Sequence, residues 1–244
     1  MAELTGEGAT GGPAEPRRSS VATLSLLLLI ALVFLLELVV SIATYRPSLG
    51  LRPSPWEFQV DLLVRLGANS WQLVFGDGEW WRMLTAPVLH TGPVHVLLNG
   101  LALWIVGPRL ERVVGPAWLL AVFVASCIFG DLVSMLFNPP EMAGVGASGG
   151  LMGLAAAALV LSARAGSGSS LRAALVGSGL SAGSIPTVIF PIASGATVDH
   201  SAHLGGALGG LCLGLFLLCR RTEPAGLRPA SLSAQVRRGA AGGC

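Results

Sequence analysis

The feature that most constrains the fold of this chain is a series of long apolar segments. The first, Val21–Thr44, is a nearly unbroken apolar run of 24 residues. A helix needs about 20 apolar residues to cross the hydrocarbon core of a bilayer. Five further apolar segments follow, at about residues 93–106, 117–137, 147–163, 171–193 and 201–219. The sequence therefore predicts an all-α polytopic membrane protein with six transmembrane helices.

The composition excludes several other classes of protein. Charged residues make up 11% of the chain and hydrophobic residues 52%, whereas a soluble domain carries about 25% charged residues. A disordered chain is excluded for the same reason. No basic run resembles a nucleic-acid-binding patch, so we expect no nucleic-acid partner. The four cysteines show neither a CxxC motif nor a Cys/His zinc spacing, so neither a disulfide framework nor a metal site is predicted.

The remaining segments differ from the apolar ones. Residues 1–20 and 220–244 are polar and predict disordered cytoplasmic tails. Residues 45–92 hold four of the six tryptophans together with charged residues, which is typical of a long loop at the membrane–water interface. The fifth apolar segment contains several glycines as well as Pro186 and Pro191, and these predict a loose or broken helix.

The distribution of arginine indicates the orientation. The chain has 15 arginines and no lysine. With both termini in the cytoplasm, 11 of the 15 lie inside, and the other four fall in the long first loop (Arg46, Arg52, Arg65 and Arg82). This distribution obeys the positive-inside rule. The Arg-, Ala- and Gly-rich composition is typical of a GC-rich bacterial genome, so we expect a bacterial plasma membrane.

Three groups of polar residues lie near the starts of the second, fourth and sixth spans. They are His95 with Asn99, Ser148, and His203 with the preceding Asp199 and His200. Polar groups inside spans are costly and mark functional sites. These three spans run in the same direction, so we expect the three groups to lie at similar depth in the outer half of the bilayer.

The three groups contain the parts needed for acyl transfer. A serine hydroxyl becomes a nucleophile when a base takes its proton, and histidine is the usual base. Unpaired N–H groups at the start of the fourth span can stabilise an oxyanion. His95 and Asn99, one turn apart on one helix face, can add side-chain donors. Taken alone, however, Gly146-Ala147-Ser148-Gly149 predicts no more than close helix packing.

Together the motifs resemble those of the rhomboid family of intramembrane serine proteases, over about Arg65 to Gly210. The matching motifs, in chain order, are Gly78-Glu79-Trp80-Trp81-Arg82, His95-x-x-x-Asn99 with the upstream His90, the turn Gly107–Gly115 with its Arg109, Glu111 and Arg112, Gly146-Ala147-Ser148-Gly149, and Ala202-His203-Leu204-Gly205-Gly206. The implied fold is a six-helix rhomboid bundle with a long interfacial first loop.

The resemblance also implies roles for residues. Ser148 is the implied nucleophile and His203 the general base of a catalytic dyad. His95, Asn99 and the Ser148 backbone N–H are the implied oxyanion site. Two glycines after His203 would let the sixth span approach the fourth, and the fifth span would gate substrate entry. The implied partners are membrane lipids and single-pass transmembrane substrates, cleaved near the outer face of the bilayer. No metal or organic cofactor is implied, and the sequence does not indicate an oligomeric state.

Several features leave alternatives open. Rhomboids often have an aromatic residue four positions after the serine, where this chain has Met152, and we expect His203 to be held less rigidly for that reason. Asp199, one helical turn before His203, would allow a Ser–His–Asp triad instead of a dyad. Glu37 has no role that the sequence reveals.

Two rival functions remain. A rhomboid-like protein that binds membrane clients without cutting them usually lacks the serine or the histidine, and this chain has both. A small transporter often shows internal repeats and charges near the bilayer midplane. No repeat is visible here, and Glu37 is interpreted as the only charge well inside a span.

Overall fold

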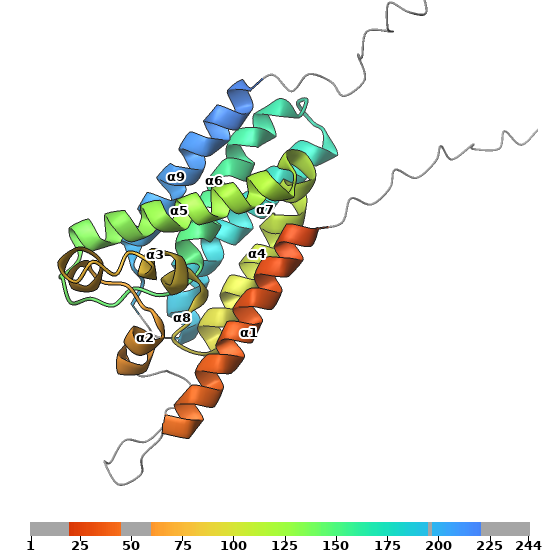
Figure 1. Cartoon of the computed structure of the whole chain (residues 1–244). Coiled ribbons are helices and arrows are strands. Elements are labelled where there is room, and N and C mark those ends of the chain that lie inside the picture. The colour runs from red at the N-terminus through yellow and green to blue at the C-terminus, as the bar shows by residue number, and fades with distance from the viewer. Residues whose placement is uncertain (1–19, 45–59, 195–196, 221–244) are drawn as a thin grey trace, which may run out of the picture.

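The computed structural model describes residues 20–44, 60–194 and 197–220. The expected tails at 1–20 and 220–244 therefore lie outside the described residues, except for Ser20 and Arg220. The regular elements of the described residues are all helices, apart from one isolated antiparallel bridge between Asn69 and Gly144. Figure 1 shows the main helices as a bundle. These helices are α1 (Val21–Thr44), α4 (Pro93–Val114), α5 (Pro116–Phe137), α6 (Ser148–Leu161), α7 (Ser170–Ser184) and α9 (His200–Cys219).

Among the residues that the structure describes, five segments are long and apolar enough to cross a membrane. They are Val21–Thr44, Pro93–Val114, Pro116–Phe137, Ser170–Ser194 and His200–Cys219. The remaining expected span is a shorter apolar helix, Ser148–Arg164, made of α6 and the 3-10 turn η4 (Ser162–Arg164). Five side chains of α6 are fully buried, namely Leu151, Leu154, Ala157, Ala158 and Leu161. The chain is thus an all-α polytopic membrane protein with α6 at the centre of its core.

Helix α4 is longer than the sequence suggested. The second span was expected to end near residue 106 and to be followed by a turn, but α4 continues through Pro108 to Val114. Transmembrane helices tolerate proline because neighbouring groups compensate for the lost hydrogen bond. The helix ends at Gly115, whose φ of +85° favours glycine.

The last turns of α4 are tied to the first turn of α1. The Glu111 carboxylate accepts hydrogen bonds from the backbone N–H groups of Ala22 and Thr23, both at 2.9 Å, and from the Thr23 hydroxyl at 2.7 Å. These N–H groups have no partner within their own helix. Glu111 therefore caps α1, and the expected loop motif is part of a helix–helix contact.

The fifth span is interrupted where proline predicted a break. Helix α7 passes into a π-helical turn, η5 (Ile185–Ile189), and then into the short α8 (Phe190–Ser194). Pro186 lies in this turn and lacks the N–H that a regular helix requires. The break places Phe190 beside the candidate site described below.

Glycines allow α9 to approach α6 at backbone distance. A Cβ added at Gly206 would lie 2.0 Å from the carbonyl oxygen of Gly149, and one at Gly210 would lie 2.0 Å from that of Gly153. Gly205, which was expected to face the same helix, faces α5 instead, where a Cβ would lie 2.7 Å from Val133 Cβ. The starts of α6 and α9 are therefore held together by Gly206 rather than by both adjacent glycines.

The first loop forms short helices at the end of the bundle where α6 and α9 begin (Figure 1). They are α2 (Val60–Leu66), η2 (Gln72–Gly76), α3 (Arg82–Thr85) and η3 (Ala86–Val88). Arg82 is buried and holds this loop to itself, donating to the Glu79 carboxylate at 2.5 Å and to the carbonyls of Val64 at 2.6 Å and Ala68 at 2.9 Å. Trp80 and Trp81 stay exposed beside it.

Candidate active site

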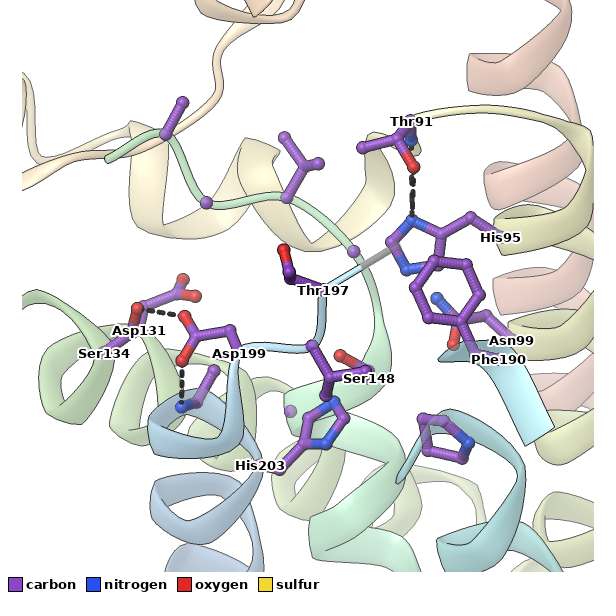
Figure 2. A pocket seen from close by; sticks show the side chains of 18 of the residues that line it. Thr91, His95, Asn99, Asp131, Ser134, Ser148, Phe190, Thr197, Asp199 and His203 are labelled. Carbon is purple, nitrogen blue, oxygen red and sulfur yellow. Dashed lines mark hydrogen bonds between the residues drawn. The ribbon is translucent and has the colours of Figure 1, made fainter. Parts of the chain in front are cut away.

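One pocket brings together all the side chains that the sequence singled out for catalysis. Its lining includes His95 and Asn99 from α4, Ser148 from α6 and His203 from α9. Figure 2 shows Ser148 beside His203, with His95 and Asn99 on another side of the pocket. Three segments that are far apart in the sequence therefore supply a single site.

Ser148 is the first residue of α6. Its backbone N–H therefore belongs to the first turn, where no intrahelical acceptor is available and the helix dipole favours negative charge. Within the described part of the chain, the Ser148 hydroxyl forms no hydrogen bond. The next residue, Gly149, lies against the backbone of α9: a Cβ there would be 3.6 Å from the carbonyl oxygen of Ala202. Ser148 precedes Gly149 and His203 follows Ala202, so this contact brings Ser148 and His203 to the same side of the pocket.

His203 is 5% exposed, and its Nδ1 is buried without a hydrogen-bond partner among the described residues. The nitrogen that remains for the pocket is Nε2. The triad alternative would require a carboxylate on Nδ1, and Asp199 was the candidate. The structure contradicts that alternative because Asp199 bonds to other groups.

Asp199 is the N-cap residue of α9. One of its oxygens accepts from the Ala202 N–H at 2.9 Å and from Asn138 Nδ2 at 3.1 Å, and the other accepts from the Ser134 hydroxyl. An aspartate at this position satisfies a free N–H of the first turn and fixes the start of the helix. Asp199 therefore positions the backbone of α9 and not the His203 ring.

His95 and Asn99 lie against the turn that precedes Ser148. A Cβ at Gly146 would lie 2.7 Å from His95 Cε1, 2.8 Å from His95 Nε2 and 3.7 Å from Asn99 Nδ2. Gly146 also has a φ of +117°. Glycine is required here twice, for the backbone conformation and for the approach of the His95 ring.

The tautomer of His95 follows from its partners. The Thr91 backbone N–H, which can only donate, lies 3.5 Å from His95 Nδ1, and the Thr91 hydroxyl lies 3.1 Å from the same atom. Nδ1 is therefore the acceptor, and a neutral ring carries its hydrogen on Nε2. Nε2 is the nitrogen that faces Gly146, so His95 presents a donor to the pocket. The Phe190 ring packs on His95 with centroids 4.7 Å apart.

His90 supports Asn99 from behind. The ring is fully buried, and its Nδ1 lies 3.2 Å from the Val88 carbonyl, which can only accept. Burial lowers the pKa of His90 well below its ordinary value, and a charge on the neighbouring His95 would lower it further. The ring is therefore neutral with its hydrogen on Nδ1, and Nε2 accepts from Asn99 Nδ2 at 3.0 Å. One N–H of the Asn99 amide is used in this bond, and the other remains for the pocket.

Several pocket residues were not predicted from the sequence. Asp131, Cys127 and Ser134 from α5 line the pocket, as does Phe190 from α8. Asp131 could have been found, because it is a carboxylate inside an apolar span; the interpretation of Glu37 as the only such charge was wrong. The Asp131 carboxyl has one buried oxygen without a hydrogen bond.

Possible metal ligands are sparse. Within residues 20–44, 60–194 and 197–220, no three side chains of His, Cys, Asp or Glu are grouped closely enough to hold a metal ion.

Comparison with known proteins identifies the family of this chain. A family model described as the Rhomboid domain matches residues 77–220, which is more than half of the chain and includes His95, Asn99, Ser148 and His203. The chain therefore belongs to the rhomboid family, whose proteases are intramembrane serine proteases.

Three relatives illustrate the similarity. The chain is 36% identical to the rhomboid protease GluP of Bacillus subtilis (strain 168) over 153 residues, which are 62% of this chain and 28% of that protein. It is 35% identical to the RHOMBOID-like protein 2 of Arabidopsis thaliana over 176 residues, 65% of this chain and 49% of that protein. It is 35% identical to the rhomboid protease AarA of Providencia stuartii over 121 residues, 44% of this chain and 43% of that protein. The match covers less than half of each of these three relatives.

Proposed function

We propose that this chain is an intramembrane serine endopeptidase in which Ser148 is the nucleophile and His203 the general base. The observation that carries the proposal is the single pocket that holds Ser148, His203 and the donor pair His95 and Asn99. Two of the relatives, GluP and AarA, are named rhomboid proteases, which supports the same activity.

The chemistry proceeds in two halves. His203 Nε2 takes the proton of the Ser148 hydroxyl as the oxygen attacks the carbonyl carbon of the substrate. The oxyanion that forms accepts hydrogen bonds from the Ser148 backbone N–H, from His95 Nε2 and from Asn99 Nδ2. His203 then gives its proton to the leaving amine, and an ester to Ser148 remains. Water attacks this ester with the same histidine as base, which releases the acid and restores the serine.

The substrates of this proposal are single-pass transmembrane proteins, cut near the outer face of the bilayer. The pocket lies at one end of the bundle, where α6 and α9 begin. The opposite end carries five of the seven arginines among the described residues, namely Arg109, Arg112, Arg164, Arg172 and Arg220. Under the positive-inside rule this end is cytoplasmic, which places both termini inside and the pocket outside. The bacterial plasma membrane is the proposed location.

The test is cleavage of a model single-pass substrate in liposomes. The purified chain is compared with Ser148→Ala and His203→Ala, and with Ser170→Ala as a matched control at an exposed position at the other end of the bundle. We expect cleavage by the wild type and by Ser170→Ala, and none by the other two variants. Cleavage that persists in Ser148→Ala would reject the assigned nucleophile.

A client-binding function is the alternative that the same experiment detects. Met152 is the departure that favours it, since the aromatic residue common at this position is absent. If the wild type binds several substrates in the liposomes and cuts none, the proposed protease activity fails and the client-binding alternative gains support.

A further inference from the structure

Glu37 is a carboxylate inside the apolar helix α1, and the pocket does not include it. Its side chain is fully buried. Placing an ionisable group in a span is costly, so such a group is retained for a specific interaction. The carboxyl oxygen Oε1 accepts a hydrogen bond from the backbone N–H of His90 at 2.9 Å.

This bond is the only one available to that N–H in the described residues. His90 lies in the irregular segment between η3 and α4, where no helix supplies an acceptor. A buried backbone N–H without a partner is destabilising, above all in a membrane. Glu37 therefore determines where the backbone of His90 lies.

His90 in turn contacts both side-chain donors of the proposed oxyanion site. Its Nε2 accepts from Asn99 Nδ2 at 3.0 Å, and its ring packs edge-on against the His95 ring with centroids 4.9 Å apart. A continuous polar path thus runs from Glu37 in α1 through His90 to Asn99 in α4. One hydrogen bond joins Glu37 to the His90 backbone, and a second joins the His90 ring to Asn99.

We propose that Glu37 is a positioning residue, which acts from α1 through His90 to keep the Asn99 amide and the His95 ring directed at the oxyanion. This inference rests on the proposed function. The second oxygen, Oε2, has no partner among the described residues, so the interaction needs one acceptor and no negative charge. A glutamine at this position supplies the same acceptor.

The first experiment compares kcat and KM in liposomes. Glu37→Leu removes the acceptor, Glu37→Gln keeps it, and Leu36→Ala is the control at an exposed neighbouring position of α1. We expect Glu37→Leu to lower kcat about 10- to 100-fold with KM within about twofold. A misplaced donor weakens the stabilisation of the transition state much more than it weakens substrate binding. Glu37→Gln should stay within about threefold of the wild type, and Leu36→Ala should match it.

The second experiment is a double-mutant cycle with Asn99→Ala. If Glu37 acts in part through Asn99, Glu37→Leu lowers kcat by a smaller factor in the Asn99→Ala background than in the wild type, and the remaining loss is the part that acts through His95. If the two losses multiply, or if Glu37→Leu lowers the melting temperature and leaves kcat unchanged, the positioning role is overturned. If Glu37→Leu does not fold, Glu37→Asp replaces it; withdrawing the carboxylate by one methylene should lower kcat without raising KM, and an unchanged kcat would overturn the role.

The outcomes separate this inference from the proposed function. Cleavage by the wild type that is lost in Ser148→Ala establishes the protease, and equal kcat values for the wild type and Glu37→Leu then reject the inference alone. If the wild type does not cleave, the rate at which a fluorophosphonate probe labels Ser148 is measured instead, because that reaction uses the same donors. Slower labelling of Glu37→Leu supports the inference, and equal labelling rejects it.

Discussion

At the scale of single residues, the two histidines of α4 and its preceding segment differ in which ring nitrogen carries the hydrogen. Thr91 donates to His95 Nδ1, which leaves the hydrogen on Nε2 facing the pocket. Val88 accepts from His90 Nδ1, which leaves Nε2 as an acceptor for Asn99. Backbone groups thus set both tautomers. The arrangement requires both rings to be neutral.

The first prediction concerns the pH dependence contributed by His90. Burial lowers its folded-state pKa well below 6.5, the ordinary value. Below pH 6.5 the unfolded chain binds a proton that the folded chain does not, so this group's contribution to the free energy of unfolding falls as the pH falls, by about 1.4 kcal/mol per pH unit. The melting temperature in detergent should therefore decrease from pH 7 to pH 5, and His90→Gln should flatten that decrease. His200→Gln, at an exposed position, is the control; equal slopes for the wild type and His90→Gln would contradict the prediction.

The second prediction concerns Gly146. Gly146→Ala places a methyl group 2.7 Å from His95 Cε1 at a φ of +117°. We expect kcat to fall about 100-fold, because His95 must move away from the oxyanion, in addition to a backbone cost of about 1–2 kcal/mol in stability. Gly78→Ala is a matched control: its φ is +76°, and a Cβ there meets nothing within 4 Å. A similar loss of kcat in both variants would show that backbone strain alone is responsible.

At the scale of secondary-structure elements, the contact between α6 and α9 determines whether Ser148 and His203 meet. Gly206 and Gly210 face the carbonyls of Gly149 and Gly153 one helical turn apart. A methyl group at Gly206 would lie 2.0 Å from backbone, which cannot move without separating the helices. Backbone contact of this kind is typical of small-residue helix interfaces in membranes.

The third prediction follows from this contact. Gly206→Ala should lower the stability by more than the 1–3 kcal/mol typical of overpacking and should abolish measurable cleavage. Gly177→Ala, also within a helix, meets nothing within 4 Å and should change the stability by no more than about 1 kcal/mol, in the stabilising direction. The measurements are the melting temperature and the cleavage rate. Normal cleavage by Gly206→Ala would mean that the helices can separate without loss of the site.

The elements also show what could be predicted from the sequence. The break at Pro186 was predictable because proline and glycines act locally. The extension of α4 beyond Pro108 was not, because it depends on the contact of Glu111 with α1, which lies 88 and 89 positions away along the chain. His95, Asn99, Ser148 and His203 could be predicted because they are polar residues of catalytic types that stand near the starts of apolar spans. The hydrogen bond from the His90 backbone to Glu37 could not be predicted from the sequence, because only the tertiary structure brings α1 to the segment before α4.

At the scale of the whole molecule, the two ends of the bundle differ in what holds them. At the end away from the pocket, Arg164 donates to the carbonyls of Leu217, Leu218 and Arg220 at the end of α9. Arg220 in turn lies over the Trp118 ring at 5.2 Å. Free carbonyls at a helix end attract such cations. The arginines at this end therefore stabilise helix termini, apart from any effect on the orientation of the chain in the membrane.

The fourth prediction tests the orientation of the molecule. Asp77, in the first loop, and Ser167, between η4 and α7, are exposed at opposite ends of the bundle. In a background with the four cysteines replaced by alanine, Asp77→Cys should react with a membrane-impermeant maleimide in intact cells, and Ser167→Cys only after the membrane is opened. The reason is the proposed orientation, in which the positive-inside rule keeps the arginine-rich end in the cytoplasm. Cleavage activity of each variant serves as the control for folding. Labelling of Ser167→Cys in intact cells would invert the topology and place the Ser148 pocket on the cytoplasmic side, which would redirect the search for substrates to peptide bonds near the inner face.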